Sequence, residues 1–121
     1  MRNLAPHIFR KRVFIEGFYN VNVNATLIKE ILTELCKILK MTPLTEPLIF
    51  SCTGRGSGKH HGIGGYMAWV ESGVSIYTWE KYNFFTVDIY SCKDFKVEDA
   101  VNFIKDKLKS RDLEYEEFRY L

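Results

Sequence analysis

Two runs of alternating side chains, residues 73–79 and 84–92, dominate the hydrophobic pattern of this chain. Both are rich in aromatic and β-branched residues, and alternation over such a length is typical of half-buried β-strands. The four residues between them, 80–83, are enough for a hairpin loop. We expect Trp79 to face Phe84 across this hairpin. The register then pairs Tyr77 with Thr86, Ser75 with Asp88, Gly73 with Tyr90, and Glu71 with Cys92.

This register divides the hairpin into two different faces, because side chains alternate along a strand. One face is apolar and is expected to lie under helices: Val74, Ile76, Phe85, Val87 and Ile89. The other is polar and aromatic, as a ligand-binding or subunit-facing surface would be: Ser75, Tyr77, Trp79, Thr86, Asp88, Tyr90 and Cys92. The same register is expected to bring the Cys92 thiol close to the Glu71-Ser72 peptide bond.

Two amphipathic helices are predicted, at residues 24–40 and 97–109, because apolar residues recur there at spacings of three and four. Further strands are predicted at 12–19, 48–52, 64–71 and 113–121. Each helix needs an apolar surface, and the hairpin supplies one. The sequence therefore predicts an α+β fold. It is a two-layer α/β sandwich with a mainly antiparallel sheet, both helices on one face, and a single domain over residues 1–121.

Charge and cysteine content exclude several classes of protein. The 17 Lys and Arg against 15 Asp and Glu leave a net charge of +2, which does not favour binding to nucleic acid or to a membrane surface. No apolar run is long enough to span a membrane. Cys36, Cys52 and Cys92 are odd in number and lack the spacing of metal ligands. We therefore expect reduced thiols in a cytoplasmic protein, with Cys36 as a small buried residue.

Residues 53–62 form a basic, glycine-rich stretch, TGRGSGKHHG. Glycines let backbone N–H groups converge on an anion, with Arg55, Lys59 and His60 as cationic side chains nearby. The spacing departs from that of a phosphate-binding loop, because Gly-Lys comes one residue early and a strand follows instead of a helix. A basic connection between strands is favoured, and an unrelated anion-binding module is the alternative. His60 and His61 lack supporting ligands, so no metal site is predicted.

The stretch that contains the hairpin combines Glu71-Ser72, a short strand ending in Thr78-Trp79, and Cys92 twenty residues after the serine. In these features it resembles the small prokaryotic type of S-adenosylmethionine decarboxylase. In that family a proenzyme cuts itself at a Glu-Ser bond. The serine hydroxyl attacks the preceding carbonyl, and elimination and hydrolysis leave a pyruvoyl group, which forms a Schiff base with the substrate amine and accepts electrons as CO2 leaves.

The resemblance implies roles for individual residues and for the uncovered face of the sheet. It makes Ser72 the precursor of a pyruvoyl cofactor, Glu71 the residue before the cut, and Cys92 the proton donor to the decarboxylated carbon. The family pairs two sheets in a dimer over a similar face, so a homodimer is expected.

The sequence departs from the family where processing chemistry is expected. Gly73 and Tyr77 stand at positions of family histidines, and Gly64 stands at the position of a processing serine. Tyr77 can donate a hydrogen bond, but a phenol is a poor base at neutral pH. Ser75 shares the face and is a further candidate to assist. If the resemblance is homologous, Gly73→His, Tyr77→His and Gly64→Ser together are expected to speed cleavage.

Two functions follow from the resemblance. The favoured one is an S-adenosylmethionine decarboxylase-like protein with impaired self-processing, which binds an amine or nucleoside ligand, or only a partner. Trp79, Glu80 and Tyr90 are its candidate ligand-binding residues, although the family's acidic ribose ligand falls on Lys81. The alternative is an active pyruvoyl-dependent decarboxylase that cuts itself at Glu71-Ser72. It would act on S-adenosylmethionine for spermidine synthesis, or on another amino acid.

Overall fold

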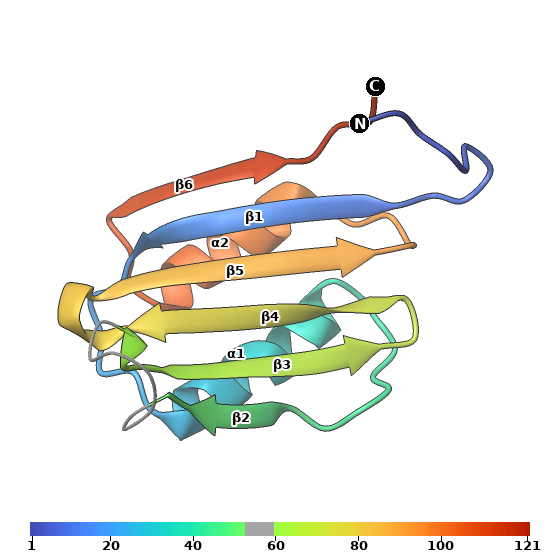
Figure 1. Cartoon of the computed structure of the whole chain (residues 1–121). Coiled ribbons are helices and arrows are strands. Elements are labelled where there is room, and N and C mark those ends of the chain that lie inside the picture. The colour runs from blue at the N-terminus through green and yellow to red at the C-terminus, as the bar shows by residue number, and fades with distance from the viewer. Residues whose placement is uncertain (53–59) are drawn as a thin grey trace.

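A computed structural model describes residues 1–52 and 60–121 of the chain. The strands form one six-stranded sheet in the order β2-β3-β4-β5-β1-β6, and every neighbouring pair is antiparallel (Figure 1). The strands are β1 (Lys11–Phe18), β2 (Leu48–Ser51), β3 (Ile63–Trp69), β4 (Ser72–Trp79), β5 (Phe84–Ser91) and β6 (Asp112–Glu117). The helices are α1 (Ala25–Ile38) and α2 (Val97–Lys107).

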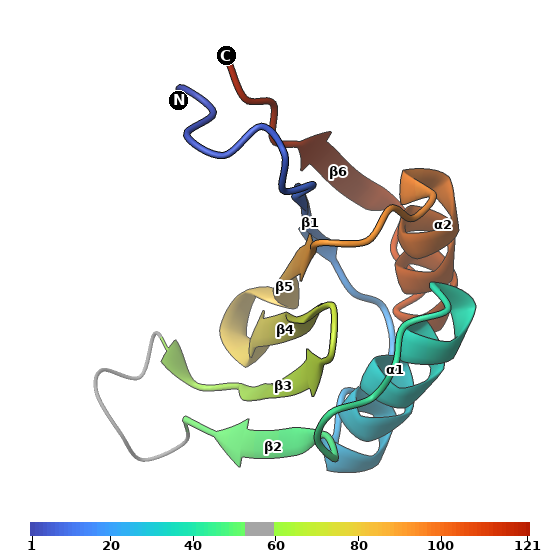
Figure 2. The same cartoon turned by 90° about the vertical axis from the view of Figure 1, so that its right-hand side faces the viewer.

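Both helices lie against the same face of the sheet, as the sequence predicts (Figure 2). Leu35 of α1 and Ile104 of α2 are completely buried in one hydrophobic core. The apolar face of the hairpin completes that core: Val74, Ile76, Phe85, Val87 and Ile89. The predicted α+β sandwich, with an antiparallel sheet and two helices on one side, is confirmed.

The hairpin of β4 and β5 has the predicted register. Trp79 pairs with Phe84, and every further pair follows in order to the end of the strands. The loop is a single turn of 3-10 helix, η2 (Glu80–Tyr82), followed by Asn83 with a φ of 51°. Asparagine tolerates this left-handed conformation better than most residues, which lets so short a loop reverse the chain.

The face of the sheet without helices is called the open face below. Its residues face away from α1 and α2, and in the order of the sheet they include Phe50 of β2; Tyr66 of β3; Ser75, Tyr77 and Trp79 of β4; Phe84, Thr86, Asp88 and Tyr90 of β5; and Arg12, Phe14, Glu16 and Phe18 of β1. Several of its large side chains are exposed, among them Phe18 and Tyr77.

Two predicted strand ends are wrong. The strand expected over residues 64–71 ends at Trp69, because the next two residues form the turn into β4. The strand expected over residues 113–121 ends at Glu117. Beyond it the chain leaves the sheet for the N-terminal arm, where the backbone N–H of Leu121 donates to the carbonyl of Met1 at 2.8 Å. Within residues 1–52 and 60–121, no helix is long and apolar enough to cross a membrane.

Candidate active site at the turn between β3 and β4

The Glu71-Ser72 bond lies where a two-residue turn enters β4. Trp69 and Ser72 close this turn as a pair, with Val70 and Glu71 between them. Ser72 has a φ of 151°, a conformation that side-chain-bearing residues rarely adopt. Such backbone geometry costs on the order of 1–3 kcal/mol and is kept only where the surroundings enforce it. The strain therefore falls on the residue after the predicted cut.

Glu71 is held at both its carbonyl and its carboxylate. Its carbonyl oxygen accepts a hydrogen bond from the backbone N–H of Cys92 at 2.8 Å. Its Oε1 accepts from the backbone N–H of Thr42 at 2.8 Å, and its Oε2 from the Thr42 hydroxyl at 3.0 Å. The Thr42 backbone hydrogen bond is the main reason that the pKa of the Glu71 carboxyl is lowered. The carbonyl that a Ser72 hydroxyl would attack is thus both fixed and polarised.

Cys92 follows the end of β5, next to this turn. Ser91 before it is buried and pairs with Ser72. The Ser91 hydroxyl donates to the carbonyl of Lys93 at 2.7 Å and accepts from the Lys93 N–H at 2.9 Å, which holds the chain around Cys92 in a tight turn. Cys92 is exposed and free. The backbone of Cys92 therefore lies beside Glu71, and the chemical role of its thiol stays a prediction.

Gly73 leaves no space for a histidine. A Cβ atom built there would lie 2.8 Å from the carbonyl oxygen of Met67 and 2.9 Å from the hydroxyl of Tyr66. The Tyr66 ring thus lies over the position where the family has a side chain. On the other side, Tyr90 pairs with Gly73 and carries the Arg12 guanidinium 4.0 Å above its ring centroid.

The space around Gly64 is likewise too small for a serine side chain. Its Cβ would lie 2.7 Å from the ring of Phe50 and 2.9 Å from the carbonyl oxygen of Ile76. Contacts under 3.0 Å to backbone atoms require the sheet itself to shift. Rings and backbone fill the space that a serine at position 64 and a histidine at position 73 would need. This is a steric argument against faster cleavage by Gly64→Ser and Gly73→His, and the expectation that they speed cleavage stays a prediction.

Two predicted catalytic residues lie too far along β4 to reach the bond in the same chain. Tyr77 comes five residues after Ser72, and a strand rises about 3.3 Å per residue, so about 16 Å separates their backbones. For Ser75 the same estimate gives about 10 Å. The structure groups Glu71, Ser72 and Cys92 at one end of the sheet and leaves Tyr77 near the other.

Trp79 and Glu80 also lie at that other end of β4. Trp79 belongs to a row of five aromatic rings that crosses the open face, with successive centroids 5.2, 6.1, 5.4 and 5.6 Å apart: Phe50, Tyr77, Trp79, Phe84 and Phe18. These spacings are those of favourable ring contacts. We call these five residues the aromatic row. Glu80 is exposed, and its backbone N–H donates to the carbonyl of His61 at 2.9 Å.

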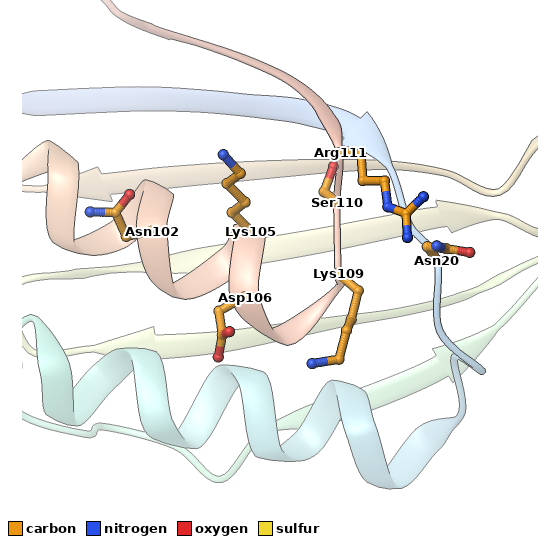
Figure 3. Close-up of a pocket in the computed structure, with 7 residues that line it drawn as sticks. All are labelled: Asn20, Asn102, Lys105, Asp106, Lys109, Ser110 and Arg111. Atoms are coloured by element: carbon orange, nitrogen blue, oxygen red, sulfur yellow. The ribbon is translucent and has the colours of Figure 1, made fainter.

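The predicted anion site is only partly described. Arg55 and Lys59 lie outside the described residues, and His60 is exposed. The described residues form a different basic hollow of about 390 Å³ at the end of α2, on the helix side of the molecule (Figure 3), lined by Asn20, Asn102, Lys105, Asp106, Lys109, Ser110 and Arg111. Within residues 1–52 and 60–121, no three His, Cys, Asp or Glu side chains gather as metal ligands would.

Sequence reasoning missed Thr42 and Tyr66. Tyr66 could have been placed on the open face by extending the alternation through β3, since it pairs with Ser75. Thr42 carries no sequence signal, because it lies in an irregular segment 29 residues from Glu71 and no period relates the two. Only the folded chain brings it to the turn.

Comparisons with known proteins agree with this fold. The family described as S-adenosylmethionine decarboxylase matches residues 16–119 of the chain. The fold is similar to that of the adenosylmethionine decarboxylase of Aquifex aeolicus VF5. Its crystal structure superimposes with a TM-score of 0.70 at 21% identity, over 93% of this chain and 91% of that one. The chain belongs to the S-adenosylmethionine decarboxylase family.

Two relatives differ in the substrate that their names state. An arginine decarboxylase proenzyme of Hyperthermus butylicus is 34% identical over 86 residues, which are 70% of this chain and 57% of that protein. An S-adenosylmethionine decarboxylase proenzyme of Pyrobaculum islandicum is 32% identical over 78 residues, 64% of this chain and 62% of that protein. The matched segments therefore span less than two thirds of the length of these relatives.

Proposed function

We propose that this chain is a divergent S-adenosylmethionine decarboxylase-like protein with impaired self-processing, which binds an amine or nucleoside ligand against its open face. The observation that carries the proposal is the loss of space at Gly64 and Gly73, where Phe50, Tyr66 and backbone carbonyls lie within 3.0 Å of any added Cβ. With Tyr77 as the third departure from the family, none of these three positions supplies the side chain that the family uses.

The residues around the turn favour the first step of self-processing, the attack, more than the second step, the elimination. In the attack, the Ser72 hydroxyl oxygen bonds to the Glu71 carbonyl carbon, the C–N bond breaks, and the hydroxyl proton passes to the nitrogen. Strain at Ser72 and the N–H of Cys92 on that carbonyl both favour this step. In the elimination, a base must remove the Cα proton of Ser72, and positions 64, 73 and 77 provide none. Ester that forms is therefore expected to return to the peptide more often than it eliminates.

The residues present fit a pyruvoyl group only in part. Once formed from Ser72, that group would supply an electron sink for loss of CO2. The described residues favour the attack that precedes it but not the elimination that generates it, so we assign no decarboxylation step to this chain.

The purified chain is expected to remain mostly intact, with Ser72 unmodified. Losing a placed base typically costs about 10²–10⁴ in rate, so cleavage should be slow and visible only after long incubation. Mass spectrometry of fresh protein measures this directly, and Ser72→Ala gives the uncut reference. Fragments of residues 1–71 and 72–121 in fresh protein, the second with a blocked N-terminus reducible by borohydride, would contradict the proposal.

An active pyruvoyl-dependent decarboxylase is the second candidate, and the φ of 151° at Ser72 favours it. The names of the relatives suggest S-adenosylmethionine or arginine as the substrate. Release of CO2 from either compound by the purified chain would promote this candidate over the first.

Ligand binding is proposed to use the aromatic row. Aromatic faces attract both flat heterocyclic rings and cations, which suits a nucleoside and an amine alike. Methylthioadenosine and agmatine are suitable probes for calorimetric titration. Trp79→Ala should weaken binding of the preferred probe by about 1–2 kcal/mol, as expected for loss of one stacking face. Tyr82→Ala is the matched control, since Tyr82 is an exposed aromatic residue outside the row. Equal losses in both variants would argue against the row.

A homodimer with facing open faces is proposed for two reasons. The open face exposes several large side chains, including Phe14, Phe18, Tyr66 and Tyr77, which is a large patch for a chain of this size. Tyr77 also lies about 16 Å from Ser72 within one chain. In an antiparallel pair of sheets, the aromatic row of one copy would approach Ser72 of the other.

The homodimer is expected to dissociate when a charge is placed on the open face. Tyr77→Lys should yield a monomer in light scattering at high micromolar concentration, because an unpaired buried charge is costly. Ile38→Lys is a matched control, since Ile38 lies on the helix side and both side chains are 41% exposed. A monomeric wild-type chain, or dissociation by both variants, would contradict the proposed interface.

A further inference from the structure

A short segment after α1 is hydrogen-bonded to the turn that carries the Glu71-Ser72 bond. This segment, residues 42–45, runs beside residues 68–71 and is called the strap below. The backbone N–H of Val70 donates to the carbonyl of Thr42 at 2.9 Å. At its other end, the N–H of Ala68 donates to the Thr45 hydroxyl at 3.1 Å, and the N–H groups of residues 44 and 45 donate to the Ala68 carbonyl at 3.0 and 3.3 Å. The turn is therefore attached to a second segment along its whole length.

Thr42 makes the strap's contacts to Glu71. Its N–H and its hydroxyl each donate to a different carboxylate oxygen, at 2.8 and 3.0 Å, so the carboxylate is held at two points. Because these hydrogen bonds lower the pKa of the Glu71 carboxyl, they stabilise the folded chain at neutral pH. This stabilisation is lost as the pH falls through the lowered pKa. The Glu71 carbonyl is held from the opposite side by the N–H of Cys92.

We propose that Thr42 is a positioning residue for the attack of Ser72 on the Glu71 carbonyl. By holding the Glu71 carboxylate while Cys92 holds its carbonyl, Thr42 prevents the residue before the bond from rotating to relieve the strained φ of Ser72. The strain is then released by the reaction, in which the peptide becomes an ester and a free amine. This inference rests on the proposed function, since it concerns the first step of self-processing.

Hydroxylamine measures this first step without requiring elimination. It attacks the ester carbonyl, forms a hydroxamate at Glu71, and releases residues 72–121 with the Ser72 amine and hydroxyl intact. The sequence contains no Asn-Gly bond that the reagent would also cut. The rate of appearance of the fragments 1–71 and 72–121 therefore reports how readily the ester forms, even in a chain that never makes a pyruvoyl group.

Thr42→Val removes the hydroxyl and keeps the backbone donor and the side-chain shape. We expect it to slow hydroxylamine cleavage about fivefold, the effect of roughly one net hydrogen bond on a barrier. Thr42→Ser restores the hydroxyl and should return the rate to within about twofold of wild type. Thr45→Val is the matched control, because it removes a strap hydrogen bond that does not touch Glu71.

A second readout separates positioning from general stability. Thr42→Val should raise the pKa of the Glu71 carboxyl in an NMR titration, and Thr45→Val should leave it unchanged. If Thr42→Val and Thr45→Val slow hydroxylamine cleavage equally, the strap only stabilises the turn, and the inference is overturned. A wild-type chain that hydroxylamine does not cut would also overturn it. Ligand titration is unaffected by either result, so failure of the inference and failure of the proposed ligand-binding function remain distinguishable.

Discussion

Adding side chains at Gly64 and Gly73 is expected to destabilise the protein without speeding cleavage. Gly73→Ala alone should cost about 1–3 kcal/mol in free energy of unfolding, because overpacking forces neighbouring atoms to move. The new Cβ would lie 2.8 Å from a backbone carbonyl oxygen, which cannot turn aside as a flexible side chain can. The loss in free energy of unfolding should lie at or beyond the upper end of that range for Gly73→His and for Gly64→Ser. The double variant should lose more than either single variant.

Urea denaturation midpoints test this directly. Ser75→Ala is a suitable control, since it lies two residues further along the same face and removes atoms instead of adding them. Adding Tyr66→Ser to Gly73→Ala should recover only part of the loss, because the ring is relieved and the Met67 carbonyl is not. A Gly73→His, Tyr77→His, Gly64→Ser variant that is as stable as wild type and cuts itself faster would show that the sheet can move.

Phe85→Ala is expected to lower the free energy of unfolding by about 3–5 kcal/mol. Phe85 is completely buried between the sheet and the helices, so its removal leaves a cavity in the core. Its neighbour Phe84 points to the open face and contacts the rings of Phe18 and Trp79 at centroid distances of 5.6 and 5.4 Å. Phe84→Ala should cost only about 1 kcal/mol in a dilute monomer, where mainly ring contacts are lost.

Protein concentration makes this pair of variants informative about assembly. If the open face is covered by a second copy, stability rises with concentration, and the cost of Phe84→Ala should rise with it. The cost of Phe85→Ala relative to wild type should change little. Equal costs for the two substitutions at all concentrations would contradict the assignment of the two faces.

Local patterns determined the pairing of the central strands. Alternation with period two assigns each residue of the hairpin to a face, and a one-residue slip would have turned Val87 and Ile89 out of the core. The loop of residues 80–83 allowed only a small choice of registers. For the same reason the proximity of the Cys92 backbone to Glu71 could be predicted, because it follows from counting along two antiparallel strands.

The candidate site was predicted less completely than the fold. The sequence located Glu71, Ser72 and Cys92, which the structure brings to one end of the sheet. The resemblance also assigned Tyr77 to the catalytic group, although the strand rise separates Tyr77 from Ser72 by about 16 Å within one chain. The resemblance to a family identified positions 64, 73 and 77 as different, but not what fills the space that their side chains would occupy.

By itself, the sequence determined the fold class, the two faces of the sheet and the register that places Cys92 beside Glu71. Each of these follows from the period of hydrophobic residues along strands and helices, which depends only on residues close together in the sequence. Only the tertiary structure decided that Thr42 holds the Glu71 carboxylate, that Ser72 has a φ of 151°, and that Tyr66 lies over Gly73. These contacts depend on packing between an irregular segment, a tight turn and side chains of adjacent strands, for which the chain carries no repeating pattern.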